Sequence, residues 1–189
     1  MIRPSAPADL AALRHICLLT GNDGTDATGL YSSDELLPDV FLEPYVTLAP
    51  STAWVVDLGA GPVGYLVATL DTAAFLSAWE KRWAPEFDRR HPVLPAGEEW
   101  LREWRPTPVP GHPAHLHIDL LPSAQGGGWG RALLRQVALA AVEAGVPGIH
   151  LGVSASNERA RAFYAHLGFE ELRPDGDAIL LGVAPAALL

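Results

Sequence analysis

The chain has 189 residues, of which 49% are hydrophobic, and it carries a formal net charge of −9 at pH 7. This length suits one domain with a sizeable buried core, and the composition is that of a globular protein without a membrane-spanning run. The acidic balance argues against a nucleic-acid partner, because such binding depends on neutralising phosphate charges.

The first part of the chain predicts a short strand, two helices and a β-hairpin. Ser5 is expected to cap the first helix, and the pattern Ser32-x-x-Glu35 is typical of a capping box at the start of the second. Two β-type runs lie on either side of a glycine-containing turn, as in a hairpin. The expected elements are a strand at 1–3, helices at 6–19 and from 32 to about 44, and strands at 53–58 and 63–70.

The segment 71–113 is rich in tryptophan and proline. Within it, Phe75, Trp79 and Trp83 recur at helical spacing. A structureless connection of this length is unusual in a compact domain, so we expect short helices packed on the sheet. Two interpretations are open: the segment only covers the sheet, or it forms one wall of a binding pocket.

A strand is predicted at 115–121, where polar and apolar side chains alternate. Its polar side chains His115, His117 and Asp119 share one face of the strand. A histidine is suited to accept a proton at neutral pH, whereas an aspartate needs a raised pKa or acts by orienting a cationic amine. Asp119 is the preferred functional candidate, because a buried carboxylate without a partner is costly. A purely structural role for the histidines stays open.

A glycine-rich loop follows this strand and opens directly onto an amphipathic helix predicted at about 127–144. Amides at a helix start have no intrahelical partner, and the helix dipole adds partial positive charge, so the loop predicts a phosphate site. The next residues, Arg131-Ala132, exclude a P-loop, and the glycine spacing does not match the dinucleotide fingerprint. The glycines are Gly126, Gly127, Gly128 and Gly130.

The remainder of the chain predicts a strand, a helix and a closing hairpin. The expected elements are a strand at 149–153, a helix at 157–167 and strands at 169–172 and 179–183. Together with the earlier elements they predict a mixed, twisted sheet with helices on both faces.

Two motifs resemble the GNAT N-acetyltransferase superfamily. The first, Leu120-x-Pro122-x-x-Gln125-x-x-Gly128-x-Gly130, is similar to the end of its fourth strand and its acyl-CoA loop. The second is similar to its Asn-x-x-Ala-x-x-Phe-Tyr…Gly-Phe stretch and runs from Asn157 through Phe163-Tyr164 to Gly168-Phe169. The resemblance implies a single domain over 1–189: an α/β fold with a mostly antiparallel sheet of about seven strands, helices on both faces, and 71–113 as a helical insertion between strands three and four.

The resemblance also implies acetyl-CoA-dependent transfer of an acetyl group to a primary amine, on a small molecule or a lysine, by direct attack in a ternary complex. Strands four and five would splay apart, so that the backbone of Leu120 or Leu121 binds the pantetheine arm and stabilises the oxyanion. Tyr164 would protonate the departing thiolate, with Asp119 or His117 as the base. The implied cosubstrate-binding residues are Leu120, Leu121, Gln125, Gly126, Gly127, Gly128, Trp129, Gly130, Arg131, Asn157 and Tyr164.

Two loop positions depart from the family pattern, and two assignments have alternatives. Gly127 stands where a basic residue is common, so Arg131 would supply the phosphate charge, and Trp129 replaces a smaller aliphatic residue. Asn157 either binds the cosubstrate or only caps its helix. Tyr164 either acts as the acid or only packs in an apolar helical stripe.

Within the superfamily, the stretches 16–25 and 64–75 and the tryptophan-rich insertion resemble bacterial relatives of the acetyltransferase-like C-terminal domain of animal O-GlcNAcase. The expected partners are acetyl-CoA and an amine, with no nucleic acid, membrane or metal, in a monomer or homodimer. The single cysteine, Cys17, favours a cytoplasmic location. The alternatives are a catalytically silent acyl-CoA-binding or protein-interaction module, and transfer to a hydroxyl group.

Overall fold

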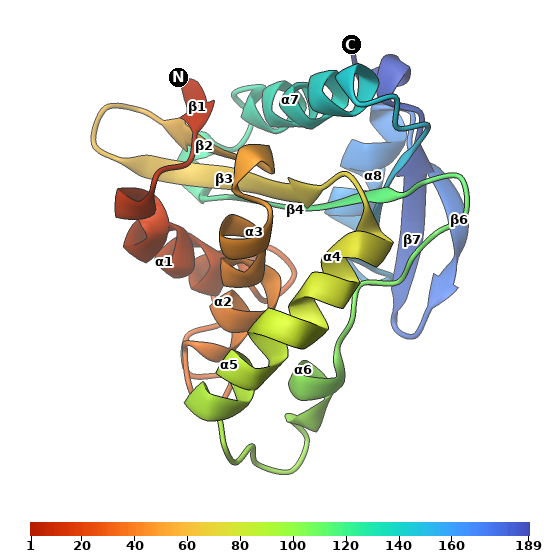
Figure 1. Cartoon of the computed structure of the whole chain (residues 1–189). Coiled ribbons are helices and arrows are strands. Elements are labelled where there is room, and N and C mark those ends of the chain that lie inside the picture. The colour runs from red at the N-terminus through yellow and green to blue at the C-terminus, as the bar shows by residue number, and fades with distance from the viewer.

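One twisted sheet organises the structure, a computed structural model that describes residues 1–189 (Figure 1). The strand order is β1-β2-β3-β4-β5-β7-β6, and only β4 and β5 are parallel neighbours. The strands are β1 (Ile2–Pro4), β2 (Ala53–Asp57), β3 (Pro62–Thr69), β4 (Ala114–Leu120), β5 (Ile149–Ser154), β6 (Glu170–Asp175) and β7 (Ala178–Val183). This mostly antiparallel, seven-stranded sheet confirms the predicted fold class.

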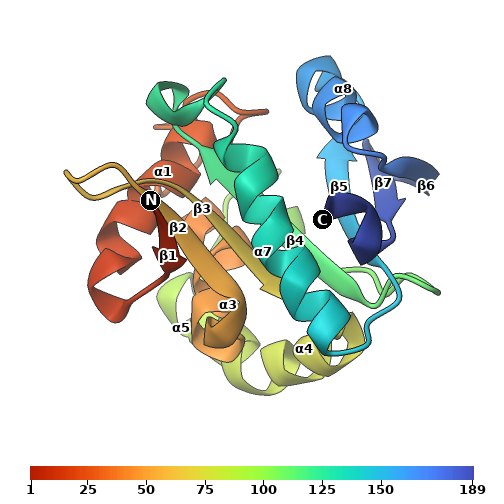
Figure 2. The same cartoon turned by 90° about the horizontal axis from the view of Figure 1, so that it is seen from above.

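Helices cover both faces of the sheet. Figure 1 shows the first six helices beneath it, and Figure 2 shows α7 running across β3 and β4, with α8 beside β5 and β7. The helices are α1 (Leu10–Thr20), α2 (Leu36–Phe41), α3 (Glu43–Leu48), α4 (Thr72–Ala78), α5 (Ala84–Arg90), α6 (Glu99–Glu103), α7 (Trp129–Glu143) and α8 (Glu158–His166). None of them is both long and apolar enough to cross a membrane.

Successive side chains of the central strands point to opposite faces of the sheet and form two separate hydrophobic cores. Tyr65 and Val67 of β3 pack with α1 to α6, whereas Leu66 and Ala68, their chain neighbours, pack with α7 and α8. Each core contains 19 buried residues, so both faces of β2 and β3 are covered. The sheet therefore separates an early helical layer from a late one.

The insertion 71–113 forms the short helices that were expected. Helices α4 and α5 are joined by one π-helical turn, Trp79–Trp83, and α6 follows. The indole of Trp83 is buried and donates to the main-chain carbonyl of Asp39 at 2.7 Å, which ties the insertion to α2. A guanidinium, that of Arg105, lies 3.9 Å from the ring centre of Trp79.

The predicted cap of the first helix is wrong. The helical segment starts with a 3-10 turn at Pro7–Asp9, and its N-cap residue is Ala6 rather than Ser5. The carboxylate of Asp9 accepts from the Ala6 amide at 2.8 Å and pairs with Arg3 of β1 at 2.7 Å. The side-chain hydrogen bond at the start of this helical segment is therefore made by Asp9, three residues after Ala6, and not by Ser5.

The predicted capping box at Ser32 is also wrong. The amide and hydroxyl of Ser32 donate to the carboxylate of Glu98, at 2.8 and 2.6 Å, and α2 begins only at Leu36. The expected helix breaks at Leu42, because Pro44 lacks an amide hydrogen and its ring obstructs the preceding turn. Other predicted elements lie within a few residues of the observed ones.

Candidate active site

Strands β4 and β5 separate soon after they meet. They pair only at Ala114 with Ile149 and at His115 with His150, although β4 continues to Leu120. Beyond His115, the edge of β4 that faces β5 therefore has no partner strand. This opening lies between α7 and α8 in the view of Figure 2.

The unpaired edge of β4 presents main-chain groups of Leu120 rather than of Leu121. The amide of Leu121 donates to Val63 of β3 at 2.9 Å, and its carbonyl accepts from Ala124 at 2.8 Å. Because neighbouring residues of an antiparallel ladder point to opposite sides, the amide of Leu120 points toward β5. The expectation that either residue offers a backbone donor is thus corrected to Leu120 alone.

Six consecutive amides, in the loop after β4 and the first turn of α7, make no hydrogen bond in the protein. They are the amides of Gly126, Gly127, Gly128, Trp129, Gly130 and Arg131, and the first paired amide belongs to Ala132. Gly126 and Gly128 have φ angles of 76° and 77°, a left-handed conformation that glycine adopts without strain. No side chain caps α7. This row of donors is the physical basis of an anion site.

Two aromatic side chains pack against glycines of the loop. A Cβ atom on Gly130 would lie 3.0 Å from the ring of Phe163, so glycine allows α7 to approach α8. The indole of Trp129 lies against Gly127, where a Cβ atom would be 3.1 Å away. The exposed side chain of Arg131 forms no ion pair within the protein.

Gln125 bridges the two sides of the opening. Its amide nitrogen donates to the carbonyl of Leu120 at 2.9 Å, and its oxygen accepts from Arg159 of α8 at 2.7 Å. A ligand that binds the Leu120 carbonyl along this edge of β4 competes with the side-chain amide of Gln125 for that oxygen.

Two residues of α8 have distinct surroundings. Asn157 caps the helix, accepting from the Ala160 amide at 3.0 Å, and its amide nitrogen has no partner in the protein and remains available to a ligand. Tyr164 is buried between Phe163 and Phe169, and its hydroxyl has no partner in the protein, yet it is not sealed from solvent. Burial first, and then a nearby carboxylate charge, raise the pKa of Tyr164, so the phenol keeps its proton at neutral pH.

The nearby carboxylate is that of Asp119. Burial raises its pKa, although a hydrogen bond from the Tyr65 hydroxyl opposes the shift. Its charge also raises the pKa of Cys17 on α1, after the larger effect of burial. Asp119 and Tyr164, which the sequence placed on different elements, are therefore close enough to interact electrostatically.

Histidines on β4 are joined by a buried tyrosine that the sequence did not single out. The Tyr45 hydroxyl lies 2.6 Å from Nε2 of His115 and 3.0 Å from Nε2 of His117. The Thr72 hydroxyl lies 2.8 Å from Nδ1 of His115. Burial lowers the pKa of His117 to about 4 and also lowers the pKa of His115 well below its ordinary value, so both rings are neutral at pH 7. No cluster of side chains is arranged to hold a metal ion.

The insertion contributes aromatic side chains next to His117. The ring centre of Trp104 lies 5.7 Å from that of His117, and the ring of Phe41 contacts both, with its centre 4.9 Å from that of Trp104 and 5.5 Å from that of His117. Trp100, which is 43% exposed, continues this wall to the surface and contacts Tyr31. The segment therefore covers the sheet and places Trp104 beside His117.

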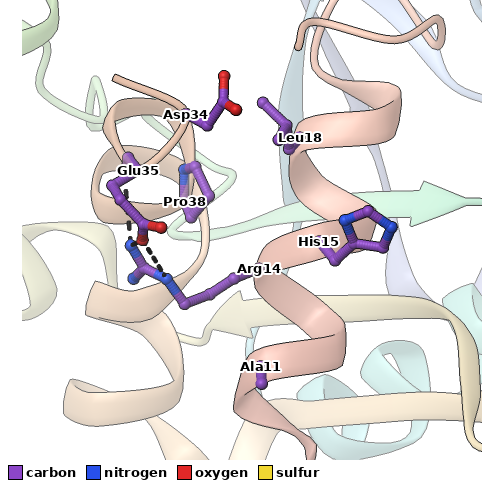
Figure 3. A pocket seen from close by; sticks show the side chains of 7 residues that line it. All are labelled: Ala11, Arg14, His15, Leu18, Asp34, Glu35 and Pro38. Carbon is purple, nitrogen blue, oxygen red and sulfur yellow. Dashed lines mark hydrogen bonds and ion pairs between the residues drawn. The ribbon is translucent and has the colours of Figure 1, made fainter.

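Surface hollows elsewhere do not coincide with these groups. One lies between α1 and α2, where Arg14 pairs with Glu35 (Figure 3). A second contains Asp39, which is nearly inaccessible and accepts from Arg14 and Arg90 at 2.6 and 2.9 Å. Neither includes any residue of β4 or of the glycine loop. These ion pairs hold α1, α2 and α5 together.

Acidification is expected to destabilise the protein through His117. The unfolded chain binds a proton at this residue near pH 6.5, but the folded chain binds it only near pH 4. The stability that the neutral His117 ring contributes is therefore present above about pH 6.5 and is lost as the pH falls toward 4. Between pH 7 and 5 the wild type should lose about 2 kcal/mol more than His117→Gln, measured by urea unfolding. Parallel losses in the two proteins would contradict the prediction.

The chain matches the model of the acetyltransferase (GNAT) family over residues 25–169. The crystal structure of SsHAT is 38% identical in sequence, covers 98% of both chains and superposes with a TM-score of 0.92. The PaiA N-acetyltransferase of Thermoplasma acidophilum, solved in complex with coenzyme A, is 15% identical, with a TM-score of 0.60 and coverage of 97% of this chain and 98% of that chain. Naa20 of Chaetomium thermophilum, in complex with a bisubstrate analogue, is 22% identical, with a TM-score of 0.58 and coverage of 97% and 86%. The last two share the fold.

Proposed function

The chain belongs to the GNAT family and is an acetyltransferase, and from that premise we propose that it transfers the acetyl group of acetyl-CoA to a primary amine by direct attack. The single observation that carries this proposal is the row of free amides from Gly126 to Arg131. Together with the dipole of α7 and the unpaired Arg131 guanidinium, they suit the diphosphate of coenzyme A. Gln125 and the free amide nitrogen of Asn157 would complete the binding site.

The open edge of β4 supports the thioester. Leu120 would bind the pantetheine arm by main-chain bonds once Gln125 has released its carbonyl, in the manner of an added strand. The same residue's amide is the donor available to the oxyanion of the tetrahedral intermediate. Tyr164, still protonated at neutral pH, would then give its proton to the departing thiolate.

The face of β4 that carries His117 and Asp119 is the proposed binding side for the acceptor amine. His117 contacts the aromatic side chains of Phe41 and Trp104 there. A carboxylate orients an ammonium group, and aromatic faces attract it as well. One of these two β4 residues would take the amine proton. Direct attack in the complex of protein, acetyl-CoA and amine would then need no further group.

Within the family, we place this chain with bacterial relatives of the O-GlcNAcase C-terminal domain and expect it to act in the cytoplasm. The stretches at 16–25 and 64–75 and the tryptophan-rich insertion support that placement. The lone, buried Cys17 is compatible with a reducing compartment.

Calorimetry and turnover test the proposal. Titrating coenzyme A into the folded protein should release heat with 1:1 stoichiometry, and acetyl-CoA should be consumed with at least one member of a panel of small amines and lysine peptides. Absence of binding would contradict the proposal at its base. Binding without turnover would favour a catalytically silent acyl-CoA-binding module, and turnover with alcohols alone would favour O-acetylation.

A further inference from the structure

We propose that Thr72, His115 and Tyr45 are positioning residues that set the tautomer of His117, so that Nδ1 of His117 accepts the proton of the attacking amine. This inference rests on the proposed function and chooses between its two candidate bases. It is carried by a chain of hydrogen bonds that begins at a group with only one possible role, the main-chain carbonyl of Pro113.

The chain has one consistent arrangement at its buried end. The carbonyl of Pro113 can only accept, and the Thr72 hydroxyl lies 2.7 Å from it. That hydroxyl has one hydrogen, which it donates to the carbonyl, so its oxygen must accept from its other neighbour. That neighbour is Nδ1 of His115 at 2.8 Å, which therefore carries a proton.

The next two bonds follow from the neutrality of the first ring. Burial lowers the pKa of His115 well below its ordinary value, so a ring with a proton on Nδ1 has none on Nε2. The Tyr45 hydroxyl, 2.6 Å away, then donates to that nitrogen. Having spent its only hydrogen, Tyr45 accepts from Nε2 of His117 at 3.0 Å.

His117 is consequently held as the Nε2-protonated tautomer with a lone pair on Nδ1. That nitrogen makes no hydrogen bond in the protein, and it is not among the polar atoms sealed from solvent. The ring is held between Tyr45, Phe41 and Trp104, on the side where the acceptor is expected. The lone pair is thus free and oriented before any substrate arrives.

Asp119 suits a different task. Its Oδ2 atom is engaged by the Tyr65 hydroxyl, and it lies two residues beyond His117 on the same face of β4. From that position its charge can orient the amine and stabilise the imidazolium that forms at His117. His117 is therefore the base, and Asp119 provides the electrostatic stabilisation.

The proton balance of the step is complete. The nitrogen of a neutral amine attacks the acetyl carbon, an N–C bond forms, and the amine proton moves to Nδ1 of His117. The C–S bond then breaks, and the thiolate takes the Tyr164 proton. His117 releases its extra proton to water and Tyr164 regains one from water, so the products are the amide and free coenzyme A.

Long-range ¹H–¹⁵N NMR of the histidine rings tests the tautomers without requiring turnover. Wild-type protein should show His117 protonated on Nε2 and His115 protonated on Nδ1, with signals assigned through His117→Gln and His115→Gln. Tyr45→Phe should turn His117 into a tautomer mixture. A wild-type His117 protonated on Nδ1, or a single unchanged tautomer in Tyr45→Phe, would overturn the proposal.

A matched pair of variants guards against misfolding of Tyr45→Phe. Thr72→Ser keeps the hydroxyl and should keep the wild-type tautomers and kcat. Thr72→Val keeps the shape of the side chain without the hydroxyl, so the His115 ring should no longer hold a single tautomer and kcat should fall about tenfold. The KM for acetyl-CoA should stay constant in both. Equal kcat in the pair contradicts the positioning role. A wild type without turnover contradicts the proposed function and the base role, while the spectra still decide whether Thr72 and Tyr45 orient the ring.

Discussion

Replacing Tyr164 by phenylalanine should lower kcat by about 100-fold or more, because the departing thiolate loses its proton donor. The hydroxyl has no partner within the protein, so its removal breaks no internal hydrogen bond. The rest of the ring keeps its packing against Phe163 and Phe169. The effect is therefore expected in the chemical step and not in folding or in cosubstrate affinity.

Three measurements distinguish an effect of Tyr164→Phe on the chemical step from effects on folding or on cosubstrate affinity. Steady-state kinetics give kcat, calorimetry gives the affinity for coenzyme A, and thermal unfolding gives stability. The affinity should change by less than about threefold and stability by less than about 0.5 kcal/mol, as for a substitution that removes no contact. A kcat equal to that of the wild type would remove Tyr164 from the mechanism and leave it as a packing residue.

Gly128→Val should weaken coenzyme A binding by roughly 100-fold. Gly128 has a φ angle of 77°, which a β-branched residue adopts only with strain, so the loop must rearrange. Rearrangement misaligns the amides between Gly126 and Arg131 that are proposed to hold the diphosphate. Losing one or two charge-assisted hydrogen bonds at about 1.5–3 kcal/mol each accounts for the expected loss.

Gly145→Val is the matched control for Gly128→Val. Gly145 follows the C-terminal end of the same helix, α7, and has a φ angle of 67°, so the backbone strain is similar. Both variants should lose stability by about 1–2 kcal/mol, but only Gly128→Val should lose affinity in calorimetry. Equal affinities in the two variants would show that the loop amides do not bind the cosubstrate.

Local patterns in the sequence were sufficient for the elements and for the loop. The glycine loop and the helix after it are encoded by adjacent residues, so their order and geometry follow from short-range rules. The insertion was predicted as short helices because an apolar period is also a local signal. Asn157 illustrates the same point, since its capping bond reaches only three residues along the chain.

Long-range contacts account for what the sequence did not reveal. Tyr45 is 70 residues from His115, and Tyr65 is 54 residues from Asp119, so no spacing rule connects either pair. The failed capping box has the same cause, because Ser32 bonds Glu98, 66 residues away. The Leu121 amide is not available to a ligand because it already bonds β3. Which amides of β4 are paired in this way depends on the register between β3 and β4.

The separation of the two cores by the sheet has an evolutionary consequence. Everything proposed to handle the acyl donor follows Ile118 in the chain, whereas the acceptor wall and the histidine supports come from elements before Pro113. Strand β4 alone belongs to both halves. A lineage could therefore exchange the helices that follow Thr72 between β3 and β4 and acquire new amine specificity, while Thr72 and the residues proposed to bind the thioester are retained.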